Sequence, residues 1–235
     1  MAKAITFACV KGNEKMSITA MVLKMSEGLG RTCAIFGLTL LFALPLGLII
    51  ALMRMSRIKV LRAATKVFIS IMRGTPLMLQ LLVVTYGPFY LFGTGVARNK
   101  LIPIIIGFSL NYAAYFAEIY RGGIESMPVG QYEAAAVLGY SKMQTFMRII
   151  LPQVVKRILP SVTNEVITLV KDTSLSRIIA LQEIIWAGQA FLKGTQGISG
   201  AIWPLFFTGI YYLIFSGLLT LALGKLEKKL DYFKA

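Results

Sequence analysis

Four long stretches without a charged side chain constrain the fold of this chain more than any other feature. They are residues 32–53, 74–97, 101–117 and 198–224. A helix needs about 20 apolar residues to cross the hydrocarbon core of a bilayer. Three of the stretches are long enough, and the remaining one, residues 101–117, is near the lower limit. None has the polar face of a helix that packs on a soluble core. We therefore predict an all-α integral membrane protein.

The composition and charge agree with this prediction. The chain is 57% hydrophobic and 15% charged, whereas soluble domains are about 25% charged. A net charge of +15 can indicate nucleic acid binding, but Lys and Arg here lie between the apolar stretches, where they anchor helix ends. Cys9 and Cys33 lack the spacing of a disulfide framework or a metal site. We expect no nucleic acid partner and no metal or cofactor in this chain.

The apolar pattern predicts five transmembrane helices. The first span begins near Gly30 and ends at Arg54, Thr75-Pro76 opens the second, and residues 158–170, with Glu165 inside, form an imperfect fourth. Residues 1–28 are then an N-terminal extension, residues 29–224 the transmembrane domain and residues 225–235 a tail. The basic loops 54–66 and 121–157 fall on one side with the tail, which places them in the cytoplasm and the N-terminus outside.

The loop between the third and fourth spans, residues 122–157, has the signals of two short helices. Pro128 precedes a helix-forming stretch with three consecutive alanines, and Gly139 stands where a left-handed C-cap is needed. Ser141 and Gln144 fit a capping box that opens a second helix, which we expect to end at Pro152. The alanines allow the close approach of a helix to a groove on another protein. The same residues equally suit an amphipathic hairpin that rests on its own bundle.

The spacing in this loop resembles a known motif. Glu133-Ala134-Ala135, Gly139, Ile149 and Leu151-Pro152 stand at the spacing of the EAA motif of ABC importer permeases. Two further stretches are similar to the polar amino-acid branch of that family, and they are Met72-Arg73-Gly74-Thr75-Pro76 with Gln80, and Leu159-Pro160 through Lys171-Asp172-Thr173-Ser174-Leu175. The likeness runs from about Gly30 to the C-terminus.

The resemblance implies a permease subunit of an ATP-driven amino-acid importer in the bacterial inner membrane. Two permease subunits, identical or paralogous, form the path, two cytoplasmic ATPase subunits bind ATP and Mg²⁺, and an extracytoplasmic solute-binding protein delivers the substrate. The coupling residues that contact the ATPase are then Glu133, Ala134, Ala135 and Gly139. The chain itself is then no enzyme. It has no Gly-x-x-x-x-Gly-Lys-Ser/Thr loop, so a partner must hydrolyse the nucleotide.

Polar residues inside the spans are candidates for the substrate path, because charges in a bilayer are costly and usually face a cavity or a partner. The candidates are Arg73, Asn164, Glu165, Thr168, Lys171, Asp172 and Ser174. Glu165 is suited to hold an ammonium or guanidinium group, or it forms a buried structural pair. Arg73 either lines the path or snorkels to the interface. Asp172 either lines the path or pairs with Lys171, and Glu118 suits a helix-end anchor.

Two other functions are compatible with a membrane protein. A scaffold or regulatory subunit without transport would leave the activity of a partner ATPase independent of substrate. A membrane enzyme, such as a lipid phosphotransferase, needs clustered acids or histidines, but the chain has no His and its only Asp residues are Asp172 and Asp231. The choice of amino acid, and of a homodimer or a heterodimer, stays open.

Overall fold

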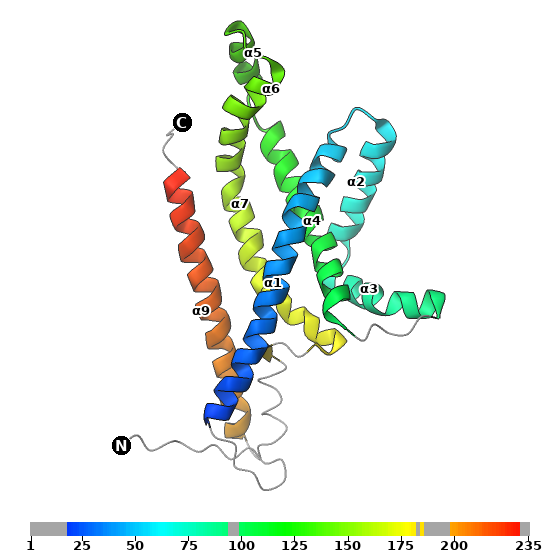
Figure 1. The fold of residues 1–235 in the computed structure, drawn as a ribbon, viewed down its shortest axis with the longest axis vertical. Coiled ribbons are helices and arrows are strands. Elements are labelled where there is room, and N and C mark those ends of the chain that lie inside the picture. The colour runs from blue at the N-terminus through cyan, green and yellow to red at the C-terminus, as the bar shows by residue number, and fades with distance from the viewer. Residues whose placement is uncertain (1–17, 94–98, 182–183, 186–197, 231–235) are drawn as a thin grey trace. The chain divides into compact units, whose positions relative to one another are not determined.

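The computed structural model describes residues 18–93, 99–181, 184–185 and 198–230, and this part of the chain is helical without a β-strand. The helices are α1 (Ile18–Arg54), α2 (Lys59–Gly74), α3 (Leu77–Phe92), α4 (Leu101–Glu125), α5 (Val129–Val137), α6 (Lys142–Thr145), α7 (Leu151–Asp172) and α9 (Ile198–Leu230). Figure 1 shows these α-helices. A π-helical turn, Phe146–Ile150, joins α6 to α7, and a 3₁₀ helix, Thr173–Ile179, follows α7. The predicted all-α class is confirmed for the described residues.

The chain divides into two compact units that interleave in sequence. The first unit contains residues 1–38, 78–106 and 168–218, and the second contains residues 39–77, 107–167 and 219–235. In the first unit, the rings of Phe36 on α1 and Phe215 on α9 pack edge to face, with centroids 5.3 Å apart. The second unit holds the loop helices that the sequence singled out.

Among the described residues, three helices are long and apolar enough to cross a membrane. They are Met25–Arg54, Leu101–Glu125 and Phe206–Leu230, and a fourth candidate is the pair α2 and α3, which breaks at Thr75 and Pro76. The helix after the break begins at Leu77, as Thr75-Pro76 predicts. The predicted count of five spans exceeds this number and stays a prediction. The sequence also predicts a second, moderately apolar piece after the fourth span, residues 178–192, and most of it lies outside the described residues.

The first helix begins at Ile18, before the predicted start of the first span near Gly30, and residues 18–29 contain no proline. One expected helix boundary is wrong. The second loop helix does not end at Pro152, since α6 passes through the π-helical turn directly into α7, which runs to Asp172. In that turn Leu151 donates its N–H to the carbonyl of Phe146, five residues back. The ladder is therefore already shifted where Pro152 lacks a donor, so the proline is accommodated without a break.

The core of the second unit is a close contact between α1 and α4. A Cβ atom added at Gly47 would lie 2.8 Å from Cβ of Phe116 and 3.1 Å from the carbonyl oxygen of Ala113. Ala113, Ala114 and Ala117 form a buried cluster there with Ile50, Ala51 and Ile69. Small residues let helix backbones approach closely in a membrane, where association depends on packing rather than on the exclusion of water.

The break after α2 is held by side-chain hydrogen bonds within the second unit. The carbonyl of Ile71 accepts from the backbone N–H of Thr75 (3.1 Å) and from its hydroxyl (2.8 Å). The carbonyl of Met72 accepts from Nδ2 of Asn111 on α4, at 3.0 Å. Asn111 is buried. These bonds satisfy backbone acceptors that the end of a helix leaves without a partner.

Replacing Gly47 by leucine tests the contact between α1 and α4. Overpacking of this kind costs about 1–3 kcal/mol, so we expect a lower melting temperature of the detergent-solubilised chain. Gly37→Leu is the matched control, because it lies on the same helix and a Cβ there meets nothing within 4 Å. Equal melting temperatures for the two variants would contradict the packing described above.

Candidate functional site

Helix α5 ends in a glycine cap at the position that the sequence predicts. Gly139 has φ of +77°, a left-handed conformation that is costly for residues with a Cβ. The N–H of Gly139 donates to the carbonyl of Ala136 and the N–H of Tyr140 donates to the carbonyl of Ala135, both at 3.0 Å. These two bonds constitute a Schellman motif. The glycine C-cap is confirmed, and it fixes the direction of the chain after α5.

The capping box that follows is also confirmed. The N–H of Gln144 donates to Oγ of Ser141 at 3.3 Å, and the N–H of Ser141 donates to Oε1 of Gln144 at 2.9 Å. The helix after the glycine therefore begins at a defined residue. With the Schellman motif, only Gly139 and Tyr140 separate Leu138 from Ser141, so the tip formed by α5 and α6 is a stiff turn (residues 129–145).

The tip stands on a packed base formed by the ends of α4 and α7. Met127, Ile150 and Val154 are buried there, with Ile124, Phe146, Ile149 and Ile158 packed against them. A Cβ added at Gly123 would lie 2.2 Å from Cγ2 of Ile158, so the two helices touch at this glycine. Arg157 donates from Nη1 to the carbonyl of Ser126 at 2.6 Å and to its hydroxyl at 3.1 Å. A displacement of the tip would therefore be transmitted to both α4 and α7.

Apolar side chains of the tip are exposed beside the predicted coupling residues. Val137 is 88% exposed, Leu138 73% and Met143 69%, and Val129 and Met147 are exposed as well. Glu133, Ala134 and Gly139 are exposed, whereas Ala135 is buried. A patch of large apolar side chains outside a core marks an interaction site. Sequence reasoning identified the alanines and the glycine but not these apolar residues.

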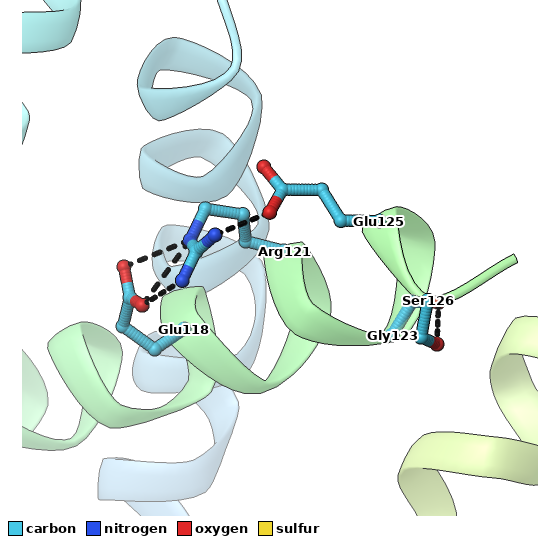
Figure 2. A network of polar contacts seen from close by, with 5 residues as sticks. All are labelled: Glu118, Arg121, Gly123, Glu125 and Ser126. Atoms are coloured by element: carbon cyan, nitrogen blue, oxygen red, sulfur yellow. Dashed lines mark hydrogen bonds and ion pairs between the residues drawn. The ribbon is translucent and has the colours of Figure 1, made fainter.

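An ion-pair network holds the end of α4 below the tip. Figure 2 shows the guanidinium of Arg121 between the carboxylates of Glu118 and Glu125. Its Nη2 lies 2.5 Å from Oε2 of Glu118, and its Nε donates to both oxygens of that carboxylate at 3.2 Å. The hydroxyl of Ser126 donates to the carbonyl of Gly123 at 2.8 Å. Glu118, interpreted from the sequence as an anchor, forms its ion pair along its own helix.

The candidates for the substrate path separate into two faces. Asn164, Thr168 and Lys171 are exposed and recur at helical spacing along α7. Glu165 and Asp172, seven residues apart on α7, are half-buried, as is Ser174 in the 3₁₀ helix. Arg73 lies at the end of α2, with its guanidinium carbon 5.2 Å from the ring centroid of Tyr115. Within the second unit, Arg73 is therefore held by an aromatic ring of α4.

Three buried hydroxyls add polar groups that sequence reasoning missed. Thr39, Ser109 and Thr163 lie in the second unit, on α1, α4 and α7, and form no hydrogen bond within the described residues. Their only sequence signal is a hydroxyl inside an apolar run. As for metals, no three His, Cys, Asp or Glu side chains come together in the part of the chain that the structure describes.

Comparison with known proteins decides the family. Residues 43–232 match the model of the binding-protein-dependent transport system inner membrane component. The chain belongs to this family. It is therefore a permease component of a transporter, and the resemblance seen in the EAA-like loop is confirmed.

Individual relatives agree with this assignment. The permease is 35% identical over 212 residues to the L-cystine transport system permease protein TcyB of Bacillus subtilis, with 90% of this chain and 88% of that protein covered. It is 31% identical over 209 residues to the putative glutamine transport system permease protein GlnP of Rickettsia felis, covering 89% and 94%. A crystal structure of an amino acid ABC transporter with histidines contains a similar chain, with a TM-score of 0.81, 28% identity and coverage of 90% and 96%.

Gly139→Val tests the turn at the tip of the permease. A left-handed residue with a Cβ costs roughly 1–2 kcal/mol, so we expect the amides of residues 139 and 140 to exchange hydrogen about 5–30 times faster. Gly130→Val is the control, because Gly130 lies in α5, has no positive φ and faces open space. Unchanged exchange in Gly139→Val would contradict the cap, as would the same acceleration in Gly130→Val.

Proposed function

We propose that this permease is half of the translocation path of an ATP-driven amino-acid importer and that its tip couples the path to a cytoplasmic ATPase. The observation that carries the proposal is the stiff, apolar and exposed tip, which begins with the EAA-like sequence and stands on the packed ends of α4 and α7. Its relatives' names include cystine and glutamine transport systems, which supports an amino acid as the substrate.

The coupling mechanism follows from the stiffness of the tip. An ATPase subunit binds Val137, Leu138 and Met143 in an apolar cleft, and the exposed backbone at Ala134 allows close approach. Gly139 fixes the angle of the turn and Glu133 contacts the ATPase, whereas the buried Ala135 packs inward. When the ATPase pair closes on ATP and Mg²⁺, the displacement passes through the base to α4 and α7. The nucleotide and the metal ion stay with the partner, so this chain is not itself an enzyme.

The assembly contains two permease subunits, two ATPase subunits and an extracytoplasmic solute-binding protein. In this arrangement the permease crosses the bacterial inner membrane five times, with residues 1–28 outside and residues 225–235 in the cytoplasm. α7 provides the fourth crossing, although it is not among the helices that suffice by length and composition. Three features support the orientation. They are the basic residues 54–66, the loop 121–157 and the lysines of the last segment, which the five crossings place on one side.

The path itself is assigned to the half-buried face of α7. Glu165 offers a carboxylate for the ammonium group of an amino acid, and Asp172 and Ser174 follow along the same segment. Thr39, Ser109 and Thr163 supply hydroxyls in the interior of the second unit. The exposed residues Asn164, Thr168 and Lys171 suit contacts with the second permease subunit better than with the substrate.

ATP hydrolysis by the reconstituted complex tests the proposed function. We expect the solute-binding protein loaded with its amino acid to stimulate hydrolysis, because substrate delivery and ATPase closure are coupled through the tip. Gly139→Val should lower this stimulation while the protein remains inserted, and Gly130→Val should retain it. Flat hydrolysis across a panel of amino acids would favour a scaffold or regulatory subunit and would contradict import.

Glu165→Gln tests the assignment of the path. The substitution removes one negative charge with little change in shape, so we expect uptake of cationic amino acids to fall about tenfold or more, as for a lost hydrogen bond to a charged group. Thr168→Ala, on the exposed face of the same helix, is the control. If uptake by Glu165→Gln equals that of the unmodified permease, Glu165 has a structural role only.

A further inference from the structure

Helix α2 presents a stripe of cations next to a stripe of exposed apolar residues. Lys59, Arg62, Lys66 and Arg73 recur every three, four and seven residues, so they share one side of the helix. Val60, Val67 and Ile71 are exposed on an adjacent side. Thr65 and Ile69 are buried against the rest of the second unit. A helix with these faces suits the boundary between lipid tails and headgroups.

The cationic stripe opens into a small cavity. Its volume is about 180 Å³, and it is lined by Arg54, Lys66, Ile69, Ser70, Arg73 and Glu118. All six residues belong to the second unit. Pockets for drug-sized ligands occupy roughly 300–1,000 Å³, so this cavity suits a single small group.

The charges around the cavity are unbalanced. Three cations face one carboxylate, and that carboxylate, Glu118, is already bound by Arg121 at 2.5 Å. Within the described residues, no acidic side chain forms an ion pair with Arg54, Lys66 or Arg73. The sequence supplies no other local acid, since no Asp or Glu occurs between Glu27 and Glu118. One carboxylate among three cations leaves a net positive charge at the cavity, and an anion bound there would reduce the repulsion between the cations.

The position of the cavity identifies the anion. Arg54 is the last residue of the candidate span Met25–Arg54, so the cavity lies near the edge of the hydrocarbon core rather than in bulk water. Val67 and Ile71, which share α2 with Lys66 and Arg73, offer an apolar surface to acyl chains. Guanidinium groups and a hydroxyl are good partners for phosphate oxygens. Basic pockets between membrane helices are suited to anionic lipid headgroups.

We propose that the cavity lined by Arg54, Lys66, Ser70 and Arg73 binds the phosphate of an anionic phospholipid, whose acyl chains lie along the apolar stripe of α2. The bound lipid joins the end of α1 to α2 and, through Glu118 and Arg121, to the end of α4 that carries the tip. The proposal requires insertion in a bilayer and does not depend on amino-acid import.

Native mass spectrometry of the full-length chain tests the proposal. The chain is incubated with phosphatidylglycerol or with phosphatidylcholine of the same acyl composition. We expect phosphatidylglycerol to bind at least several-fold more tightly, and Lys66→Gln to weaken it about fivefold, as for one cation near a lipid surface. Lys59→Gln is the matched control, because Lys59 lies on the same stripe but does not line the cavity. We expect that variant to bind within twofold of the unmodified chain.

Each other outcome overturns the proposal. Equal binding of the two lipids would remove the requirement for an anionic headgroup. Equal losses in Lys66→Gln and Lys59→Gln would indicate a general attraction to the basic helix rather than a site. A melting temperature raised by inorganic phosphate but not by phosphatidylglycerol would assign the cavity to a free anion. Arg54→Gln, on α1, is a second variant in case Lys66→Gln fails to fold, and it should show the same loss.

Discussion

A bilayer interior offers no hydrogen-bonding partner to a peptide group, and most of this structure follows from that constraint. Each buried N–H or C=O without a partner costs several kcal/mol in hydrocarbon, so the described chain is helical almost throughout. Where α2 ends at Thr75 and Pro76, the carbonyls of Ile71 and Met72 are bound by Thr75 and Asn111. The break is therefore tolerated because neighbouring side chains replace the helical bonds.

The tip, which the proposed function places in the cytoplasm, owes its stiffness to local hydrogen bonds instead. The helix ends of α5 and α6 are satisfied by a Schellman motif at Gly139 and a capping box at Ser141, rather than by water. Below them, Gly123 brings α4 and α7 into contact, and Arg157 closes the connection at Ser126. In the proposed function, an ATPase docked on the tip therefore acts on α4 and α7 through a short, stiff element.

Charge is distributed unevenly near the tip. Glu118, Arg121 and Glu125 pair along one helix face and leave the end of α4 with its charges satisfied. Arg54, Lys66 and Arg73 gather at the neighbouring cavity with no ion pair among the described residues. The network at the end of α4 is therefore neutralised within the protein, whereas the cations at the cavity have room for an anion from the membrane.

The sequence by itself determined the helical class, the turn and the family. Charge-free runs long enough for a bilayer leave few alternatives, the left-handed cap needs a glycine at one position, and a capping box needs two side chains three residues apart. These are local requirements, so the residues themselves reveal them. Only the tertiary structure decided that α6 continues through a π-helical turn into α7, that Ala135 is buried while Val137 and Leu138 are exposed, and that Arg54 and Arg73 meet Lys66 at one cavity. These features depend on which helices pack together, because contacts between residues far apart in sequence leave no periodic pattern along the chain.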